Sequence, residues 1–106
     1  FRYSLSDVIP PDNLQNILPD KFSLEQNYPN PFNPVTTISY KLPKNSLVTI
    51  KIYDLTGRLI STLVNENKPA GTHESIFNAS NLSSGVYFYV MKAGDFKQAR
   101  KLVFIK

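Results

Sequence analysis

The sequence contains no cysteine and no tryptophan, and its single histidine is His73. Without cysteine the fold must depend on packing, because neither a disulfide nor a cysteine-based metal site can stabilise it. One histidine leaves no second imidazole for a zinc site or for a pair of catalytic histidines. Glycine is also scarce, and the four glycines lie too far apart in the chain to form a phosphate-binding loop.

Long apolar runs are missing as well. No stretch approaches the roughly 18–20 residues that a membrane-spanning helix needs. The residues from Phe1 onward lack the charged-then-apolar arrangement of a signal peptide. Charged residues make up 19% of the 106 residues, below the roughly 25% of typical soluble domains, and hydrophobic residues make up 42%. This balance excludes a coiled coil or a disordered chain and predicts one domain with a hydrophobic core.

The net charge of +4 is unevenly distributed along the chain. Residues 1–30 hold two basic and four acidic residues, whereas residues 92–106 hold five basic residues and one acidic residue. The lysines alternate with apolar residues, and no glycine-rich aromatic RNA signature is present. We therefore expect no nucleic acid partner and interpret the charge as a solvated sheet face that is basic near the C-terminal end.

Residues 1–21 differ in character from the rest of the chain. Pro10, Pro11 and Pro19 interrupt any helix, because proline lacks an N–H group and biases the preceding residue toward extended geometry. Residues 12–18 could form one short helical turn capped by Asp12. We interpret residues 1–21 as a linker or the end of an upstream region, and residues 22–106 as the domain.

From Phe22 onward apolar residues recur with a period of two, as in half-buried strands. Ile38, Tyr40 and Leu42 form one such series, and Val48, Ile50 and Ile52 form the next. Strands are expected over residues 37–42, 48–53, 59–64, 72–77, 86–91 and 96–105, with a further one over 22–28. Short turns separate them, which predicts an all-β, immunoglobulin-like Greek-key β-sandwich of about seven antiparallel strands. A small open barrel is the alternative.

Three prolines punctuate the segment from Asn27 to Pro34. Each proline removes a ladder donor and fixes φ, so this segment should be stiff and extended and cannot be a central strand. We expect Tyr28 and Phe32 to anchor it onto the sandwich. The segment is either a rigid crossover into the next strand or a rigid surface that a partner reads.

Two further segments have a clear local interpretation. Between two strands, Gly57 can supply the positive φ of a hairpin turn, while Asp54 can accept turn N–H groups and pair with Arg58. At the C-terminal end, residues 102–105 are consecutive apolar residues of a last strand. Since the chain stops one residue later, its edge should be accessible, either protected by basic residues or open to strand addition.

Catalysis has no candidate residues. The adjacent serines, Ser83 and Ser84, lack the partners of a nucleophilic triad. The carboxylates of the strand region are isolated in sequence and fall at turns or on a wet face. We therefore expect no enzyme activity, no catalytic or metal-binding residues and no cofactor.

Taken together, the motifs of residues 22–106 resemble a type A C-terminal sorting domain of the type IX (Por) secretion system. The resemblance rests on blocks that occur in family order, which are residues 24–40, 52–58, 70–73, 84–88 and 101–106. The proline segment and the C-terminal ending are its specific parts. Phe77-Asn78 departs from the family, whose members often carry tryptophan followed by aspartate there. An immunoglobulin-like domain of flagellar hook-capping proteins shares the proline segment, but the basic ending favours the sorting domain.

The resemblance implies a non-catalytic address label that directs an upstream cargo across the periplasm and outer membrane to the cell surface or the medium. Its implied partners are an outer-membrane translocon and a shuttle protein. A surface sortase is a further partner, which removes the domain and either attaches the cargo to lipopolysaccharide or leaves it free. The residues expected to be recognised lie in the quoted motifs and comprise Asn27, Pro29, Asn30, Pro31, Gly57, Arg58, Gly85, Lys101 and Lys106.

Two other functions stay open on the sequence. A carbohydrate-binding or adhesion module would present Tyr53, Tyr87 or Tyr89 as a flat exposed platform. A structural spacer at the end of a secreted enzyme would need no recognition surface at all.

Overall fold

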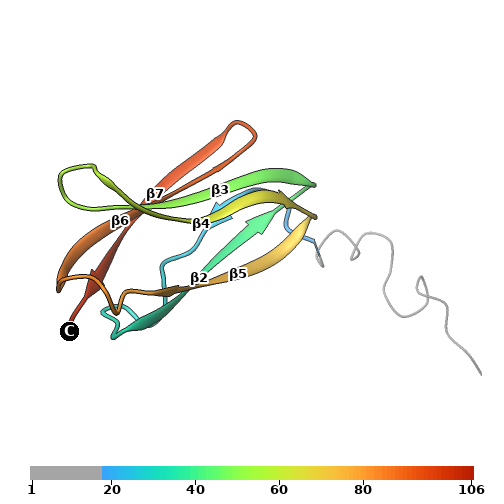
Figure 1. Cartoon of the computed structure of the whole chain (residues 1–106). Helices are drawn as coiled ribbons and strands as arrows, with labels where there is room; N and C mark the ends of the chain where they lie inside the picture. The colour runs from blue at the N-terminus through green and yellow to red at the C-terminus, as the bar shows by residue number, and fades with distance from the viewer. Residues whose placement is uncertain (1–17) are drawn as a thin grey trace, which may run out of the picture.

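The two-residue alternation of apolar side chains folds into seven strands in a computed structural model, which describes residues 18–106 (Figure 1). The strands are β1 (Ser23–Leu24), β2 (Val35–Leu42), β3 (Ser46–Tyr53), β4 (Leu59–Lys68), β5 (Gly71–Asn78), β6 (Gly85–Ala93) and β7 (Phe96–Phe104). Seven strands were expected, and the all-β prediction is confirmed. Most of the expected linker, including nearly all of the helical turn proposed for residues 12–18, lies outside the described residues.

The strands form two antiparallel sheets that pack face to face (Figure 1). One sheet has the order β1-β2-β5, and the other has the order β4-β3-β6-β7. The hairpins β3–β4 and β6–β7 stay within the second sheet, whereas the chain changes sheet after β2, after β4 and after β5. Two separate sheets with these crossings make an immunoglobulin-like Greek-key sandwich rather than a barrel.

The core lies between the sheets and is built from the inward positions of each strand. β2 contributes Ile38, Tyr40 and Leu42, and β3 contributes Ile50 and Ile52, all with 0% exposure. The predicted alternation of these two strands is thus confirmed. Aromatic residues supply much of the remaining volume, because the sequence offers no disulfide or tryptophan to fill the space between the sheets.

β6 is a central strand, as its composition predicted, because it pairs with both β3 and β7. Its two faces differ, however. Tyr87, Tyr89 and Met91 point into the core and are buried, whereas Val86, Phe88 and Val90 on the outer face are half-buried. The Tyr87 hydroxyl donates a 2.7 Å hydrogen bond to the Ser83 carbonyl, four residues upstream. This bond resembles the tyrosine corner of immunoglobulin-like domains.

β4 is longer than predicted. We expected residues 59–64, but the strand continues to Lys68, with Asn65, Glu66 and Asn67 paired to β3. Polar residues are tolerated there because β4 is an edge strand that has β3 on one side only. Two register shifts interrupt its pairing with β3, which is a common way to keep an edge strand from pairing with another chain.

Candidate recognition site

The proline segment (residues 27–34) lies along the C-terminal half of β7. The Phe32 N–H donates to the Val103 carbonyl at 3.0 Å, and the Ile105 N–H donates to the Phe32 carbonyl at 3.1 Å. The Asn30 side-chain oxygen accepts the Val103 N–H at 3.0 Å. Phe32 is 2% exposed and packs on Phe104, with ring centroids 5.2 Å apart. Segments about 70 residues apart in sequence are thereby joined side by side.

Because of these hydrogen bonds, the C-terminal part of the β7 edge is not accessible. We expected the edge of the final strand to be accessible, and for residues 101–105 that prediction is wrong. The Val103 and Ile105 backbone groups are bonded to the proline segment, and the Lys101 carbonyl accepts the Gln26 side-chain amide at 2.7 Å. The C-terminal edge of β7 is therefore already capped, and strand addition there would first have to displace the proline segment.

A network of buried polar groups on the core side holds the start of the proline segment in place. Asn27 is 2% exposed, and its side-chain amide donates to the Pro29 carbonyl at 3.2 Å and to the Thr36 hydroxyl at 3.0 Å. Its backbone N–H donates to the Tyr89 hydroxyl at 2.8 Å, and that hydroxyl donates to the Glu25 carbonyl at 2.7 Å. Burial raises the pKa of Tyr89 to about 12. Asn27 therefore positions the segment from inside and offers no surface to a partner.

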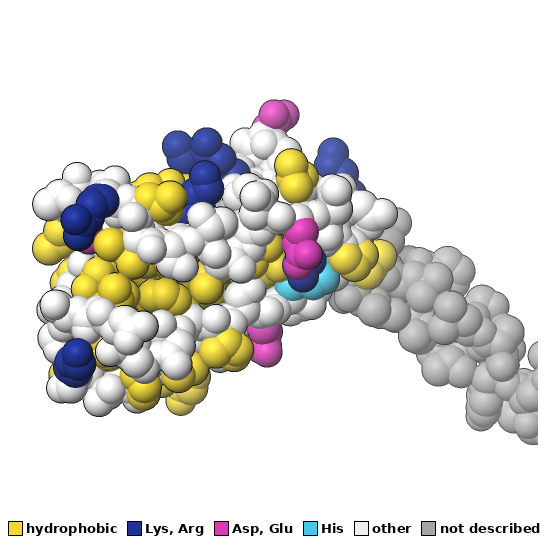
Figure 2. All heavy atoms as spheres, viewed as in Figure 1, with side chains coloured by type: hydrophobic (Ala, Val, Ile, Leu, Met, Phe, Trp, Pro, Cys, Tyr) yellow, Lys and Arg dark blue, Asp and Glu magenta, His cyan; other side chains and the backbone are white. Residues whose placement is uncertain are grey.

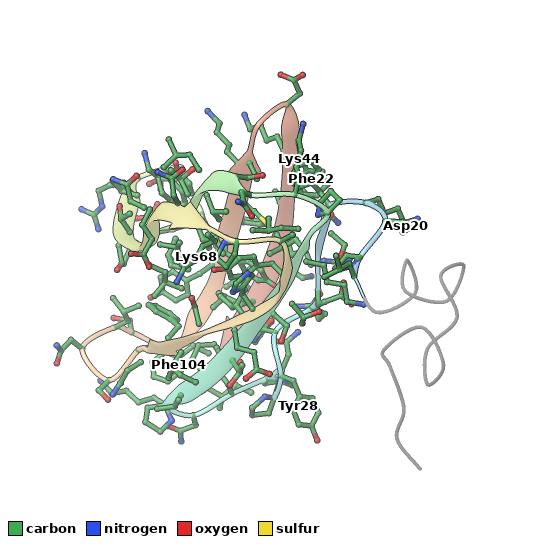
Figure 3. All side chains as sticks on the ribbon, turned by 90° about the vertical axis from the view of Figure 1, so that its right-hand side faces the viewer. Asp20, Phe22, Tyr28, Lys44, Lys68 and Phe104 are labelled. Atoms are coloured by element: carbon green, nitrogen blue, oxygen red, sulfur yellow. The ribbon has the colours of Figure 1, made fainter. Side chains whose placement is uncertain are left out.

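The two aromatic residues of the segment face opposite ways. Phe32 is buried as predicted, but Tyr28 is 81% exposed, so the expectation that it anchors the segment is wrong (Figure 3). The peptide bonds before Pro29, Pro31 and Pro34 are cis. Tyr28 pairs with Thr37 of β2, and this pairing turns its side chain to the outer face of the sheet.

The β3–β4 turn forms as its sequence predicted. Gly57 has φ 87°, and Asp54 accepts the backbone N–H groups of Thr56 and Arg58 at 2.9 and 3.0 Å. The Thr56 hydroxyl also donates to Asp54 at 2.6 Å, and the Arg58 guanidinium lies 3.2 Å from it. The Thr56 hydroxyl, with the backbone N–H of Arg58, holds the pKa of Asp54 below its usual value. Arg58 itself stays largely exposed.

This turn gives a testable pH dependence. Because the pKa of Asp54 is lowered in the fold, its stabilising effect is present above the unfolded pKa of about 4 and disappears as pH falls through the folded value. We expect Asp54→Ala to lower the melting temperature at pH 7 and the difference from the parent to shrink below about pH 4. Thermal melts from pH 7 to pH 2 would measure this. A constant difference across that range would show that the Asp54 charge does not stabilise the turn.

The β3–β4 turn and the β5–β6 loop meet at one end of the sandwich. A cavity of about 230 Å³ lies between them and is lined by Asp54 and Thr56 on one side and by Ser84 and Gly85 on the other. The Lys106 backbone N–H donates to the Ser84 hydroxyl at 2.7 Å, and its ammonium group lies 3.3 Å from the Leu82 carbonyl.

We call the region formed by residues 30–34, 54–58, 79–85 and 105–106 the loop end (Figure 1). Within the loop end, residues 32 and 34 of the proline segment are hydrogen-bonded to the other segments. Phe32 bonds Ile105, and the Ala79 N–H donates to the Pro34 carbonyl at 2.8 Å. The first described residues, Leu18 and Pro19, lie instead beside Pro43 in the β2–β3 turn at the opposite end.

Among residues 18–106 no group of histidine, cysteine, aspartate or glutamate side chains could hold a metal ion. The family described as secretion system C-terminal sorting domain matches residues 26–106, which cover both the proline segment and β7. The chain belongs to this family. A comparison with curated proteins finds no match.

Membership of the family establishes the role of this sorting domain. It is a non-catalytic signal of the type IX secretion system, and it directs its cargo across the outer membrane to the cell surface or the medium. It is therefore recognised by the machinery of that system. In the described residues no helix is long and apolar enough to cross a membrane.

The structure brings together most of the residues that the sequence proposed for recognition. Pro31, Gly57, Arg58 and Lys106 are exposed at the loop end, and Asn30 is held there by its bond to Val103. Gly85 lines the cavity, and Pro29 is exposed at the start of the segment. Two candidates lie elsewhere, since Asn27 is buried beneath the segment and Lys101 lies on the outer face of the four-stranded sheet.

Sequence reasoning missed the exposed side chain of Tyr28. An aromatic residue in a proline-rich segment looks like an anchor, and only its pairing with Thr37 shows that it faces outward. Of the tyrosines proposed for a carbohydrate platform, Tyr87 and Tyr89 point into the core, and Tyr53 alone lies on the outer face of the sheet.

Proposed function

We propose that the loop end of the sorting domain is the surface that the outer-membrane translocon and its shuttle protein read. The observation that carries this proposal is the convergence of segments distant in sequence on that one end. Asn30 and Phe32 bond the end of β7, and Lys106 bonds Ser84 in the β5–β6 loop. A partner touching this end contacts several family motifs at once, so that the folded state itself becomes part of the signal.

In this proposal residues 1–21 are the linker to an upstream cargo, and a surface sortase cuts within or before them. Leu18 and Pro19 lie at the end of the sandwich opposite the loop end, which supports this assignment. A cargo joined through that end leaves the loop end uncovered. Residues 22–106 then act as the sorting domain.

Secretion of a reporter joined to the N-terminal end of the full 106-residue chain tests the proposal. The host is a Gram-negative bacterium that has this secretion system. We expect a variant with Asn33→Ala, Arg58→Ala and Lys106→Ala, all within the loop end, to lower the reporter in the medium about tenfold and to leave it in the periplasm. The three side chains are exposed, so the melting temperature should change little.

The matched control carries Lys41→Ala and Lys44→Ala, two exposed lysines away from the loop end. It should be secreted like the parent. Equal secretion of both variants would contradict the proposal and favour a surface elsewhere on the domain. Deletion of residues 102–106 is a poorer test, because Leu102 and Phe104 are 0% and 1% exposed and their loss would unfold the domain.

A further inference from the structure

The outer face of the four-stranded sheet has a half-buried apolar middle, and on β3, β6 and β7 it carries charge of one sign. Pairing of Tyr53 with Phe88, of Val90 with Ala99 and of Val86 with Val103 gathers apolar side chains along its middle. Lysines flank them on β3, β6 and β7. We call this surface the lysine face, and its residues are Thr49, Lys51, Tyr53, Val86, Phe88, Val90, Lys92, Lys97, Ala99, Lys101 and Val103.

The lysines of this face have no acidic neighbour on it. Its outward positions on β3, β6 and β7 include four lysines and no aspartate or glutamate. Lys92 and Lys97 lie directly opposite each other across β6 and β7. Like charges in that position destabilise a sheet. Within residues 18–106 the ion pairs join Arg58 to Asp54 and Lys68 to Glu66, and neither involves the lysine face.

The other outer face of the sandwich is a useful comparison. Its outward positions on β2 and β5 carry four hydroxyl or amide side chains, two exposed apolar side chains, Val35 and Ile76, and charges of both signs, Lys41 and Glu74. That mixture is typical of a sheet face in contact with water. The two outer faces therefore differ in charge, because in the described strands the β3-β6-β7 face carries lysines alone whereas the β2-β5 face carries both signs. In Figure 2, Lys and Arg side chains lie along the upper rim of the view, with an Asp or Glu side chain at its highest point.

We infer that the lysine face docks an acidic protein surface of the secretion machinery through its apolar middle, with the lysines steering the approach. An apolar, aromatic centre with a charged rim is the arrangement of protein–protein interfaces. Complementary charge at the rim increases association rate and selectivity. The inference rests on the chain being a sorting signal and does not require the loop end to be the surface read.

A protein partner fits this face better than a nucleic acid or a membrane. Nucleic acid recognition relies heavily on arginine, and the lysine face has none. Insertion into a membrane needs apolar side chains that project into the lipid. Here Val86, Phe88 and Val90 are half-buried in the sheet surface, so they offer a flat platform instead.

One substitution separates docking from folding. Lys92→Glu replaces the repulsion with Lys97 by an attraction, so we expect a higher melting temperature at low salt. The same change reverses a rim charge, so we expect the reporter fused to the full chain to be secreted about tenfold less. Stability and secretion then move in opposite directions, which loss of folding could not produce. Lys41→Glu makes the same charge change on the other face and should be secreted like the parent.

A photo-crosslinker tests the class of partner. Benzoylphenylalanine placed at Ala99, which is exposed in the middle of the lysine face, should form an adduct with a protein during secretion. The adduct should disappear in the Lys92→Glu background and persist in the Lys41→Glu background. Normal secretion of Lys92→Glu would overturn the inference, and so would an adduct with lipid or glycan or one that is insensitive to Lys92→Glu. If only the loop-end variants lose secretion, the proposed function stands and this inference fails.

Discussion

Phe32→Ala is expected to lower the free energy of unfolding by about 3–5 kcal/mol, the range for truncating a buried phenylalanine. Phe32 is 2% exposed and packs between Phe104 and Phe77, whose ring centroids lie 5.2 and 6.2 Å from its own. The alanine leaves a cavity between the end of β7 and β5. Urea denaturation of the parent and the variant would measure the loss.

Phe32→Ala should also weaken the backbone hydrogen bonds between the proline segment and β7. The Phe32 side chain holds its own backbone against β7, where Phe32 bonds Val103 and Ile105. Loosening it exposes the backbone groups of a strand edge that the proline segment covers. We therefore expect amide hydrogen exchange at Val103 and Ile105 to accelerate and secretion of a fused reporter to fall. Ile76→Ala is the matched control, because Ile76 is an apolar residue that is 61% exposed and lies outside the loop end.

A loss below about 1 kcal/mol for Phe32→Ala would contradict this account, because that is the level of an ordinary surface substitution. The proline segment would then be held mainly by its backbone bonds and by the side chains of Asn27 and Asn30, with little contribution from the Phe32 ring. Fast exchange at Val103 in the parent protein would lead to the same conclusion.

The sequence predicted the strands well because a period of two reports burial directly. Ile38, Tyr40 and Leu42 alternate with polar residues, and each is fully buried. The Asp54–Arg58 turn was also predictable, since every contact in it lies within four residues. In both cases the information is local, and local chemistry decides the structure.

The recognition surfaces were harder to predict from the sequence. Tyr28 and Phe32 are both aromatic residues of one proline segment, and nothing local distinguishes the exposed one from the buried one. Their orientation follows from pairing with Thr37 and with Phe104, the latter 72 residues away. Long-range register of this kind is not written in the spacing of a single segment.

The excess of basic residues near the C-terminal end could be predicted from the sequence. The different positions that these side chains take in the fold could not be predicted. Arg100 turns inward, where its guanidinium bonds the Leu24 carbonyl and ties β7 to β1. Lys106 folds onto the β5–β6 loop. Lys97 and Lys101 join Lys51 of β3 on the outer face. The basic residues at the C-terminal end thus lie in three separate environments. Their positions follow from the pairing of β7 with its neighbours.

Tyr89→Phe is expected to lower the free energy of unfolding by about 2–4 kcal/mol, because it leaves two backbone groups without their partner. The Asn27 N–H loses its acceptor, and the Glu25 carbonyl loses its donor. Both groups belong to the chain that leads into the proline segment, and Tyr89 itself is 0% exposed. The hydroxyl thus fixes the start of the proline segment to the centre of the four-stranded sheet.

Tyr40→Phe provides the matched control, because Tyr40 is an equally buried tyrosine with a different environment. Its hydroxyl is buried without a hydrogen-bond partner in the part of the chain that the structure describes. Removing that hydroxyl should therefore change the unfolding free energy by less than about 1 kcal/mol, or even raise it. Denaturant titration of both variants would compare them. Equal losses at Tyr40 and Tyr89 would mean that burial of the ring, and not the bonds to Asn27 and Glu25, sets the contribution of Tyr89.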